Sequence, residues 1–521
     1  MLLRTFNGVF VVESRYEEKD ILKSFGFRWN PEIRRWWTDD YKKVNNLLNS
    51  VDVEVKATPE VKELLGKIES DRVNTLNSSI STSTEFVVDV PEGYYVYPYQ
   101  KAGIEFIYKH KKALLADDMG LGKTIEAIGL INLTRPKSIL IVTPKIALSV
   151  WEYELKRWLT LSYNITVNDG IQNEGIVLMN YEKLLKYENE VTSRSWDLII
   201  LDESQYIKNF RSKRTKIALK LKGDRKLLLT GTPILNHPEE LFTQLRFLDH
   251  PLANSFKEFA DNFLVPSEWG GYQGGKNLGI LQQELRSTVM IRRTKDQVLK
   301  ELPAKIRQII VLPSYVLKPD ILEENKKYLQ VAKTILEGGD STKIITETIG
   351  TVSPSFVFEE ISRIRHLTAL AKLPLVVEQI RDILDNDVSL VVFAHHKDVI
   401  EEIHREFPNS VVITGETSDS ERTRNVESFQ NGNVPLIIVS MHTAGTAITL
   451  TRASICLFAE LDWTPSVMIQ SEDRLHRIGQ KESVQAQYIV VDGTIDKHIT
   501  DILKQKSNEI NQTINWNMIK I

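Results

Sequence analysis

A glycine-containing loop that ends in Gly-Lys-Thr is the strongest local signal in the chain. Residues 115–124 read Leu-Ala-Asp-Asp-Met-Gly-Leu-Gly-Lys-Thr and lie between an apolar run and a helix-like stretch. Such loops present backbone N–H groups to phosphates at the start of a helix. Lys123 would reach the β- and γ-phosphates of a nucleotide, and the Thr124 hydroxyl would ligate Mg²⁺. The general pattern has glycine where this chain has Asp117, so a chance Gly-Lys-Thr at a helix start is the competing interpretation.

Two adjacent carboxylates follow another apolar run, 79 residues after Lys123. Residues 198–203 read Leu-Ile-Ile-Leu-Asp-Glu. Asp202 could hold Mg²⁺, and Glu203 could orient and deprotonate the water that attacks a nucleotide. An Asp-Glu pair after a strand is common on protein surfaces. This pair therefore indicates a nucleotide site only together with the Gly-Lys-Thr loop that precedes it.

A pair of arginines near the C-terminus could complete such a site. Residues 470–480 read Gln-Ser-Glu-Asp-Arg-Leu-His-Arg-Ile-Gly-Gln. Arg474 and Arg477 are three apart and would share one face of a helix. Arginines from a second domain can stabilise the charge that develops during phosphoryl transfer; surface ion pairs are the competing interpretation. The three signals together predict an ATP hydrolase whose site is completed by a second lobe.

Two series of β-branched runs alternate with helix-like stretches. The strands and helices that they predict must bring the three groups of candidate site residues together. Strands that alternate with helices predict parallel sheets covered on both faces, so we expect an α/β fold with two lobes. The first series is Ala113–Ala116, Ile139–Val142, Ile176–Met179, Leu198–Leu201 and Lys226–Leu229. The second series is Ser389–Phe393, Val411–Thr414, Leu436–Val439, Ile455–Ala459 and Ala486–Val491.

The chain of 521 residues is too long for one hydrophobic core, since single cores stop growing near ~250–300 residues. A polar stretch at 74–84 predicts a linker, and a glycine-rich loop near 270–275 lies in a different, more helical region. We expect a small N-terminal module over 1–55, a linker over 56–90, an ATP-binding lobe over 91–250, a mostly helical insertion over 251–375 and a C-terminal lobe over 376–521.

Composition excludes several classes of protein. No apolar stretch approaches the roughly 20 residues that cross a bilayer, and the N-terminus lacks the features of a signal peptide, so we expect a cytoplasmic protein without membrane contact. The single cysteine, Cys456, permits no internal disulfide and is expected in the core. The net charge of −3 does not indicate nucleic-acid binding, so a local patch would be needed. Residues 205–226 hold nine basic residues and one acidic, which fits such a patch or a solvated face.

The N-terminal 50 residues combine aromatic and basic side chains, as nucleic-acid surfaces often do. The competing interpretation is that the rings build the core of a small domain. The two interpretations are compatible if the rings are buried and the arginines face outward. The segment also resembles short substrate-recognition modules of phage and mobile-element enzymes. The residues concerned are Arg28, Trp29, Arg34, Arg35, Trp36 and Trp37.

Over roughly residues 95–510 the chain resembles the Swi/Snf-type DNA translocases of helicase superfamily two, which implies two tandem RecA-like lobes. Asp117, unusual in a general phosphate-binding loop, is the residue that this family carries there. The segments that carry the resemblance are Tyr97–Gly103, Asp117–Thr124, Asp202-Glu203, Leu229–Ile234, Arg292-Arg293 with Leu302–Lys305, and Asp473–Gln480.

The resemblance implies roles for individual residues. Gln100 would contact the adenine, Thr230 to Thr232 would couple the ATP site to DNA, and Ser440–Thr451 and Asp462–Pro465, with Trp463, would line the lobe interface. The strand-end loops that hold Pro144, Lys145, Asn180 and Tyr181 would face the DNA backbone. The expected catalytic residues are Lys123, Asp202, Glu203, Arg474 and Arg477, and the expected metal ligands are Thr124 and Asp202. The expected nucleotide contacts are Gln100, Asp117, Asp118, Met119, Gly120, Leu121, Gly122, Lys123, Thr124 and Gln470.

Two segments depart from the family pattern. Ser204-Gln205 stands where many members have Ala-His, and His442–Thr449 stands where members usually have a glycine-rich stretch. The segments 202–204 and 458–463 are most similar to the HepA-related annealing-helicase branch, and the compact size fits a bacterial or phage member.

The sequence thus predicts an ATP- and Mg²⁺-dependent translocase that moves on duplex or forked DNA and remodels or reanneals it. A strand-separating helicase or a restriction-system motor subunit is the nearest alternative; no nuclease-type cluster of carboxylates and lysine stands out. A nucleotide-gated DNA clamp without turnover is the alternative from another class, and the full set of catalytic residues argues against it.

Overall fold

The computed structural model places the chain in two compact units, Met1–Asn77 and Ser78–Ile521, and each is described by itself. Thr232, which was expected to couple the ATP site to DNA, lies outside the described residues, as do residues 445–447 and Trp463 of the expected lobe interface. The described residues are 1–51, 53–231, 238–266, 271–336, 354–444, 448–462 and 464–500.

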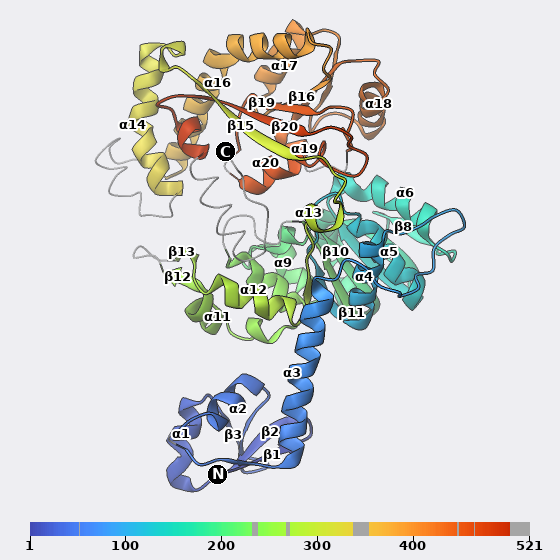
Figure 1. Cartoon of the computed structure of the whole chain (residues 1–521), viewed down its shortest axis with the longest axis vertical. Coiled ribbons are helices and arrows are strands. Elements are labelled where there is room, and N and C mark those ends of the chain that lie inside the picture. Colours follow the sequence, from blue (N-terminus) through green and yellow to red (C-terminus); the bar gives the residue numbers. More distant parts are fainter. Residues whose placement is uncertain are drawn as a thin grey trace. The chain divides into compact units, whose positions relative to one another are not determined.

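The first unit is a small sheet covered by helices (Figure 1). Its strand order is β3-β4-β2-β1-β5, antiparallel except for the β1–β5 pair. The core contains Leu3, Phe10, Val12, Phe27 and Trp36. The elements are β1 (Leu2–Phe6), β2 (Val9–Glu13), α1 (Lys19–Ser24), β3 (Arg28–Asn30), β4 (Arg35–Thr38), α2 (Tyr41–Leu48), β5 (Lys56–Ala57) and α3 (Pro59–Ser79).

The expected linker over 56–90 begins as ordered structure, because β5 and α3 occupy residues 56–79. Val61, Leu64, Leu65 and Ile68 pack against the core of the first unit. Their spacing of three and four residues is that of one helix face, so this signal was present in the sequence.

The first lobe of the second unit is built on a seven-stranded parallel sheet with the order β14-β6-β11-β10-β7-β9-β8 (Figure 1). The five predicted strands are confirmed, and the short edge strands β8 and β14 add to them. The strands are β6 (Lys112–Leu115), β7 (Ser138–Thr143), β8 (Ile165–Val167), β9 (Gly175–Asn180), β10 (Ser195–Asp202), β11 (Lys222–Leu229) and β14 (Met290–Ile291).

Helices cover both faces of this sheet, as the sequence predicts. Along β10, Leu198 and Ile200 pack with α4, α5 and α6, whereas Ile199 and Leu201 pack with α7, α9 and α10. The helices are α4 (Pro98–Lys109), α5 (Lys123–Thr134), α6 (Leu148–Trp158), α7 (Tyr181–Lys186), α8 (Glu188–Thr192), α9 (Lys213–Ala218), α10 (Glu240–Phe247), α11 (Phe256–Phe263) and α12 (Leu278–Arg286).

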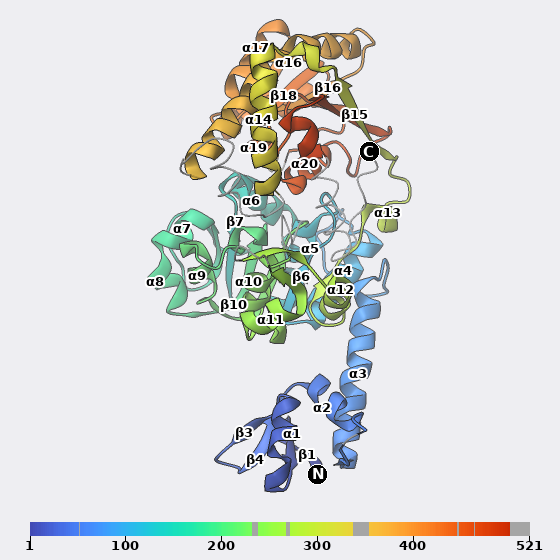
Figure 2. The same cartoon turned by 90° about the vertical axis from the view of Figure 1, so that its left-hand side faces the viewer.

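The second lobe has a six-stranded parallel sheet in the order β15-β20-β19-β16-β18-β17 (Figure 2). Its five predicted strands are confirmed, and Cys456 is buried in β19 as expected. The strands are β15 (Lys305–Leu312), β16 (Leu390–Ala394), β17 (Ser410–Ile413), β18 (Leu436–Ser440), β19 (Ile455–Phe458) and β20 (Val484–Val491). The helices are α14 (Pro319–Leu336), α16 (Pro354–Leu384), α17 (Lys397–Glu406), α18 (Asp419–Gln430), α19 (Met441–Ala444) and α20 (Pro465–Glu472).

The segment predicted as a mostly helical insertion, 251–375, also supplies a strand to each sheet. β14 joins the first sheet and β15 the second, with the short helix α13 (Lys295–Val298) between them. A hairpin of β12 (Leu264–Pro266) and β13 (Tyr272–Gly275) adds two further strands. β14 is too short for a periodic signal, and β15 alternates exposed and half-buried residues. In the part of the chain that the structure describes, no helix has the length and apolar content to span a bilayer.

Arg307 of β15 ties this edge strand to α20. Its guanidinium donates to both carboxylate oxygens of Glu472 at 2.6 Å, and both side chains are buried. Burial acts to raise the pKa of Glu472, but Arg307 and Lys305 outweigh it and lower the pKa to about 2. The pair therefore stabilises the fold fully above the ordinary pKa of 4.5, and this contribution is lost as the pH falls towards 2.

We expect Arg307→Met to lower the free energy of unfolding by about 3 kcal/mol, because it removes the bidentate cation from a buried carboxylate and leaves only Lys305 beside it. Urea unfolding at pH 7 measures this free energy. The difference in free energy of unfolding between the variant and wild type should become smaller below about pH 4.5. Lys109→Met, which removes an exposed ion pair with Glu105, is the control and should cost less than about 1 kcal/mol. Equal losses in the two variants would contradict the prediction.

Candidate active site

The carboxyl ends of the first sheet bring the predicted site residues to one edge. Neighbouring parallel strands β6, β11 and β10 are followed by the loop 117–122, by Thr230 and by Glu203, respectively. In open α/β sheets ligands bind outside the carboxyl ends of the strands, so this edge is the expected binding side.

The glycine loop has the backbone that its sequence predicts. Gly120 and Gly122 have φ of 81° and 84°, and Gly122 is the N-cap of α5. The ammonium group of Lys123 donates to the carbonyl oxygens of Asp117 at 2.8 Å and Asp118 at 3.3 Å. Thr124 lies half-buried in the first turn of α5.

The neighbouring loop packs closely against this one. A Cβ atom at Gly231 would lie 2.5 Å from Cγ of Met119 and 3.3 Å from Nζ of Lys123, so only glycine fits there. Met119 itself is buried. The loop after β11 therefore fixes the space around the lysine.

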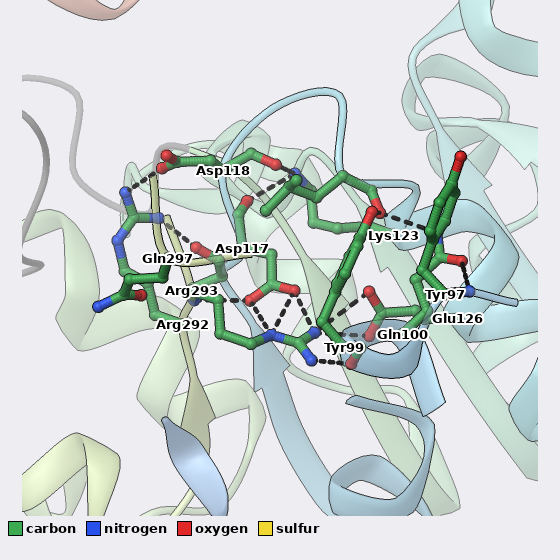
Figure 3. A network of polar contacts seen from close by, with 12 residues as sticks. Tyr97, Tyr99, Gln100, Asp117, Asp118, Lys123, Glu126, Arg292, Arg293 and Gln297 are labelled. Carbon is green, nitrogen blue, oxygen red and sulfur yellow. Dashed lines mark hydrogen bonds and ion pairs between the residues drawn. The ribbon is translucent and has the colours of Figure 1, made fainter. Parts of the chain in front are cut away.

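Two buried arginines form ion pairs with the aspartates of the glycine loop (Figure 3). The Nε atom of Arg293 donates to Asp117 at 2.9 Å, and its Nη2 donates to Glu126 at 2.9 Å. Arg292 donates to Asp118 at 2.7 Å. The carboxylate of Asp117 is thus engaged by Arg293, which explains why this loop carries aspartate in place of glycine.

Gln100 also lies against the loop. Its amide Nε2 donates to the carbonyl of Leu121 at 3.0 Å, and its Oε1 accepts from the N–H of Tyr97 at 3.0 Å (Figure 3). The Tyr99 hydroxyl donates to the same Leu121 carbonyl at 3.0 Å. Gln100 thus joins the start of α4 to the loop.

The carboxylate of Asp202 is held by several donors. Trp151 Nε1 and the Thr143 hydroxyl donate to Oδ2 at 2.7 Å and 2.9 Å, and the N–H of Glu203 donates to Oδ1 at 3.0 Å. Glu203 has φ 50° and ψ 58°, a left-handed conformation that is costly for a residue with a side chain. Such strain persists only where the surroundings fix the backbone, as they do here.

Lys123, Asp202 and Glu203 share one poorly solvated space. Burial raises the pKa of Glu203, and the neighbouring Asp202 adds to this, while Lys123 acts in the opposite direction. Burial also raises the pKa of Asp202 and lowers the pKa of Lys123. The three side chains are therefore close enough to influence one another.

Gln205 is a site residue that the sequence reasoning noted only as a departure from the family. Its Nε2 donates to Glu203 Oε2 at 2.7 Å, and its Oε1 accepts from the Thr230 hydroxyl at 2.7 Å. Its amide therefore connects the carboxylate after β10 with the loop after β11. The signal in the sequence was its place two residues after Glu203, where many family members have histidine.

The helical geometry predicted for Arg474 and Arg477 is wrong. α20 ends at Glu472, and residues 473–479 form turns and bends. The N–H groups of Arg474 and Leu475 donate to the carbonyls three residues before them, of Ser471 and Glu472, which is the bonding of turns and not of an α-helix.

Both arginines nevertheless reach the site of the first lobe. A Cβ atom at Gly120 would lie 3.0 Å from Cβ of Arg477, which places that residue directly against the loop. The charge of Arg474 acts on Glu203, where it partly opposes the rise of the Glu203 pKa that burial causes. Gln470 of α20 lines, with Gln205, Tyr206 and residues of α19 and α20, a cleft of about 440 Å³.

Two of the expected DNA-facing residues are engaged inside the lobe. Asn180 is buried and caps α7 through the N–H of Lys183 at 2.8 Å, and the buried Tyr181 donates to the Asp202 carbonyl at 2.8 Å. These two side chains are therefore not free to contact DNA, and the expectation that the loops holding them face the DNA backbone stays a prediction. Lys145 is exposed, and Pro144 is half-buried.

The residues present fit a nucleoside triphosphate with Mg²⁺. The glycine loop at the start of α5 has the backbone that receives phosphates, and Arg477 closes its other side. The hydroxyl of Thr124 and the carboxylate of Asp202 are the oxygen donors that Mg²⁺ prefers.

Comparison with known proteins gives the family. The sequence matches the SNF2-related domain over residues 99–351 and the helicase conserved C-terminal domain over residues 374–479. A solved structure titled Sulfolobus solfataricus SWI2/SNF2 ATPase core in complex with dsDNA is similar at 23% identity and a TM-score of 0.40, over 84% of this chain and 100% of that chain.

The relatives compared here come from animals, and a bacterial or phage source stays a prediction. The Caenorhabditis elegans homologue of SWI/SNF-related matrix-associated actin-dependent regulator of chromatin subfamily A-like protein 1 is 30% identical over 95% of this chain and 72% of its own length. The Xenopus tropicalis protein of that name is 31% identical over 93% of this chain, which spans about half (52%) of the relative. The human DNA annealing helicase and endonuclease ZRANB3 is 32% identical over 81% of this chain and 41% of its own length. The chain belongs to the SNF2-related family of helicase-like ATPases.

Proposed function

We propose that this chain hydrolyses ATP and uses the energy to move on duplex or branched DNA, which it remodels or reanneals. One observation carries the proposal: residues of both lobes meet at one site, with Arg477 against the glycine loop and Arg474 near Glu203. A site shared between two lobes changes when the lobes close, which is what a motor requires.

The positions of the side chains support the following catalytic roles within this proposal. The N–H groups of residues 120–123 and the Lys123 ammonium bind the phosphates of ATP. Glu203 orients the attacking water and accepts its proton, while Arg474 and Arg477 stabilise the charge on the transferred phosphoryl group. Thr124 and Asp202 hold Mg²⁺, which neutralises phosphate charge when bound.

Gln205 couples ATP hydrolysis at Glu203 to the loop after β11. Because its amide bonds Glu203 and Thr230 at once, a movement of the loop after β11 changes the orientation of the catalytic carboxylate. Thr230 to Thr232 are the proposed link to DNA, so Gln205 takes the place of the family's histidine in this coupling.

A basic surface on α9 and the preceding turn supports DNA as the track. Arg211, Lys213 and Lys216 are exposed, and the aromatic rings of Tyr206 and Phe210 are exposed beside them in the sequence. Cations and exposed rings are the groups that bind phosphates and bases.

The N-terminal unit offers a second nucleic-acid surface. Arg4, Val11, Trp37 and Arg28 are cross-strand neighbours in that order, and so lie on one face of the sheet. Leu3, Val12 and Trp36 point to the other face, which carries the core. The three arginines of this face, Arg4, Arg28 and Arg35, are exposed.

Reannealing is favoured over strand separation because the human relative of 32% identity is named a DNA annealing helicase. A strand-separating helicase, a restriction-system motor subunit and a clamp without turnover remain the alternatives that the experiments below distinguish.

ATP hydrolysis should rise at least tenfold when duplex or forked DNA is added to the protein, and single-stranded DNA should act less. Phosphate release measured with no DNA, single strands, duplex and forks tests this. Glu203→Gln is the control, and it should reduce the rate by about 10²-fold or more. No turnover under any of the four conditions would support the clamp, and displacement of a strand from a fork without annealing would support the helicase.

Gln205→Leu should lower kcat by roughly 10- to 100-fold, since it removes a hydrogen bond to a half-buried carboxylate, and a bond to a charged group is worth about 1.5–3 kcal/mol. KM for ATP should stay within about threefold, because the phosphate-binding loop is unchanged. Steady-state kinetics with saturating duplex DNA measures both constants. Thr230→Val removes the other partner of the amide and should give a smaller loss in the same direction; a rise in KM alone would contradict the assignment.

Arg28→Glu should weaken binding of forked DNA about tenfold at ~0.1 M salt and reduce the salt dependence of binding. Fluorescence anisotropy at several salt concentrations measures this. Lys23→Glu is the matched control, because Lys23 is an exposed cation of α1 in the same unit, next to the core residue Leu22. Equal weakening in the two variants would indicate a general charge effect and not a binding face.

A further inference from the structure

Lys295 touches both halves of the active site. It begins α13, between β14 of the first sheet and β15 of the second, and its side chain is buried. Its backbone N–H donates to Asp118 Oδ2 at 3.0 Å. Its ammonium pairs with Asp473 Oδ1 at 2.9 Å and donates to the His476 carbonyl. One residue therefore bonds to the glycine loop and to the turn that carries the arginines.

The first of these contacts is firmly held. Asp118 also accepts from Arg292 at 2.7 Å, so its two oxygens are both taken by the segment 292–295 (Figure 3 shows the Arg292 contact). A Cβ atom at Gly120 would lie 3.8 Å from Cε of Lys295 and 3.0 Å from Cβ of Arg477. The stem of Lys295 thus lies where the loop meets the arginine turn.

The second contact is made at the residue next to Arg474. Asp473 Oδ1 accepts from Lys305 at 3.0 Å as well as from Lys295. Lys305 and Asp473 both belong to the second lobe, so their bond is internal to it. Lys295 follows β14, which is part of the first sheet, so its bond to Asp473 joins the two lobes.

The pKa shifts agree with an ion pair between Lys295 and Asp473. Burial acts to raise the pKa of Asp473, but Lys295 and Lys305 outweigh it and lower the pKa. Burial lowers the pKa of Lys295 to about 8, with Asp473 acting in the opposite direction. A buried ammonium of this kind is retained only with a carboxylate beside it.

We propose that Lys295 is a positioning residue that transmits the position of the glycine loop to Arg474 and Arg477. When the loop shifts with its nucleotide, Asp118 moves the backbone of Lys295, and the ammonium moves the Asp473–His476 turn. The inference rests on the proposed ATP hydrolysis and deepens it, because it states how the second lobe senses the first. Lys295 itself does not touch the reacting atoms.

Lys295→Met tests the proposal, because it removes the ammonium and keeps both the stem and the N–H bond to Asp118. We expect kcat for ATP to fall at least tenfold while KM and the Kd of a fluorescent ATP analogue change less than about threefold. Lys295→Arg keeps a cation within reach of Asp473 and should recover part of kcat.

Lys372→Met is the matched control. Lys372 is buried, and its ammonium donates to Asp496 at 2.7 Å and to the Ile489 carbonyl at 2.7 Å, all within the second lobe. Both variants thus lose a buried ammonium that bonds one carboxylate and one carbonyl. We expect similar falls in Tm, with kcat of Lys372→Met within about twofold of wild type.

The outcomes separate the two proposals. A kcat loss confined to Lys295→Met supports the positioning role, whereas equal kcat losses in the two variants, or none, overturn it. If wild type binds ATP without hydrolysing it, the proposed hydrolysis fails. In that case the distance between the lobes tests the inference. It is measured, with and without nucleotide, between spin labels on the exposed residues Lys186 of the first lobe and Arg405 of the second. Loss of the nucleotide-dependent change only in Lys295→Met supports it, and the same change in all three proteins overturns it.

Discussion

Arg293 is wholly buried, and its guanidinium lies between the carboxylates of Asp117 and Glu126. Removing one partner from such a group leaves an uncompensated buried charge, which costs about 3–5 kcal/mol. Asp117 belongs to the glycine loop, Glu126 to α5 and Arg293 to the segment after β14. The three elements that shape the phosphate-binding side are therefore held in place by charge balance, and the conformation of the loop depends on a residue 176 positions away in the sequence.

The same constraint operates in the second lobe. Glu472 and Asp473 lie immediately before Arg474, and the cations that neutralise them come from Lys295, Lys305 and Arg307. The segment from Arg292 to Arg307, which runs from the end of β14 into β15, thus supplies the counter-charges for both halves of the site. This distribution explains why the segment is rich in basic residues although it contributes none of the proposed catalytic side chains.

The sequence predicted the parallel strands well, and it failed where contacts between residues far apart in the chain determine the structure. The runs around Leu198 and Leu436 have the β-branched character of fully buried strands, so periodicity sufficed. β14 is two residues long and exists only because β6 offers it an edge. The spacing of Arg474 and Arg477 suggested a helix, but α20 ends at Glu472 and the backbone bonds that follow are those of turns. Gln205 stood out as a variant residue, yet its link to Thr230 joins two loops and left no local pattern.

The central claim is that one ATP site is completed by arginines from the second lobe, and Arg477→Ala tests it most directly. ATP binding, measured with a fluorescent analogue, should stay within a few-fold of wild type, because the loop and Lys123 remain. Single-turnover hydrolysis with duplex DNA should fall by roughly 10³-fold or more, as for the loss of an arginine finger. Hydrolysis at the wild-type rate would contradict the account, since Arg477 would then lie beside the loop without acting on the phosphates.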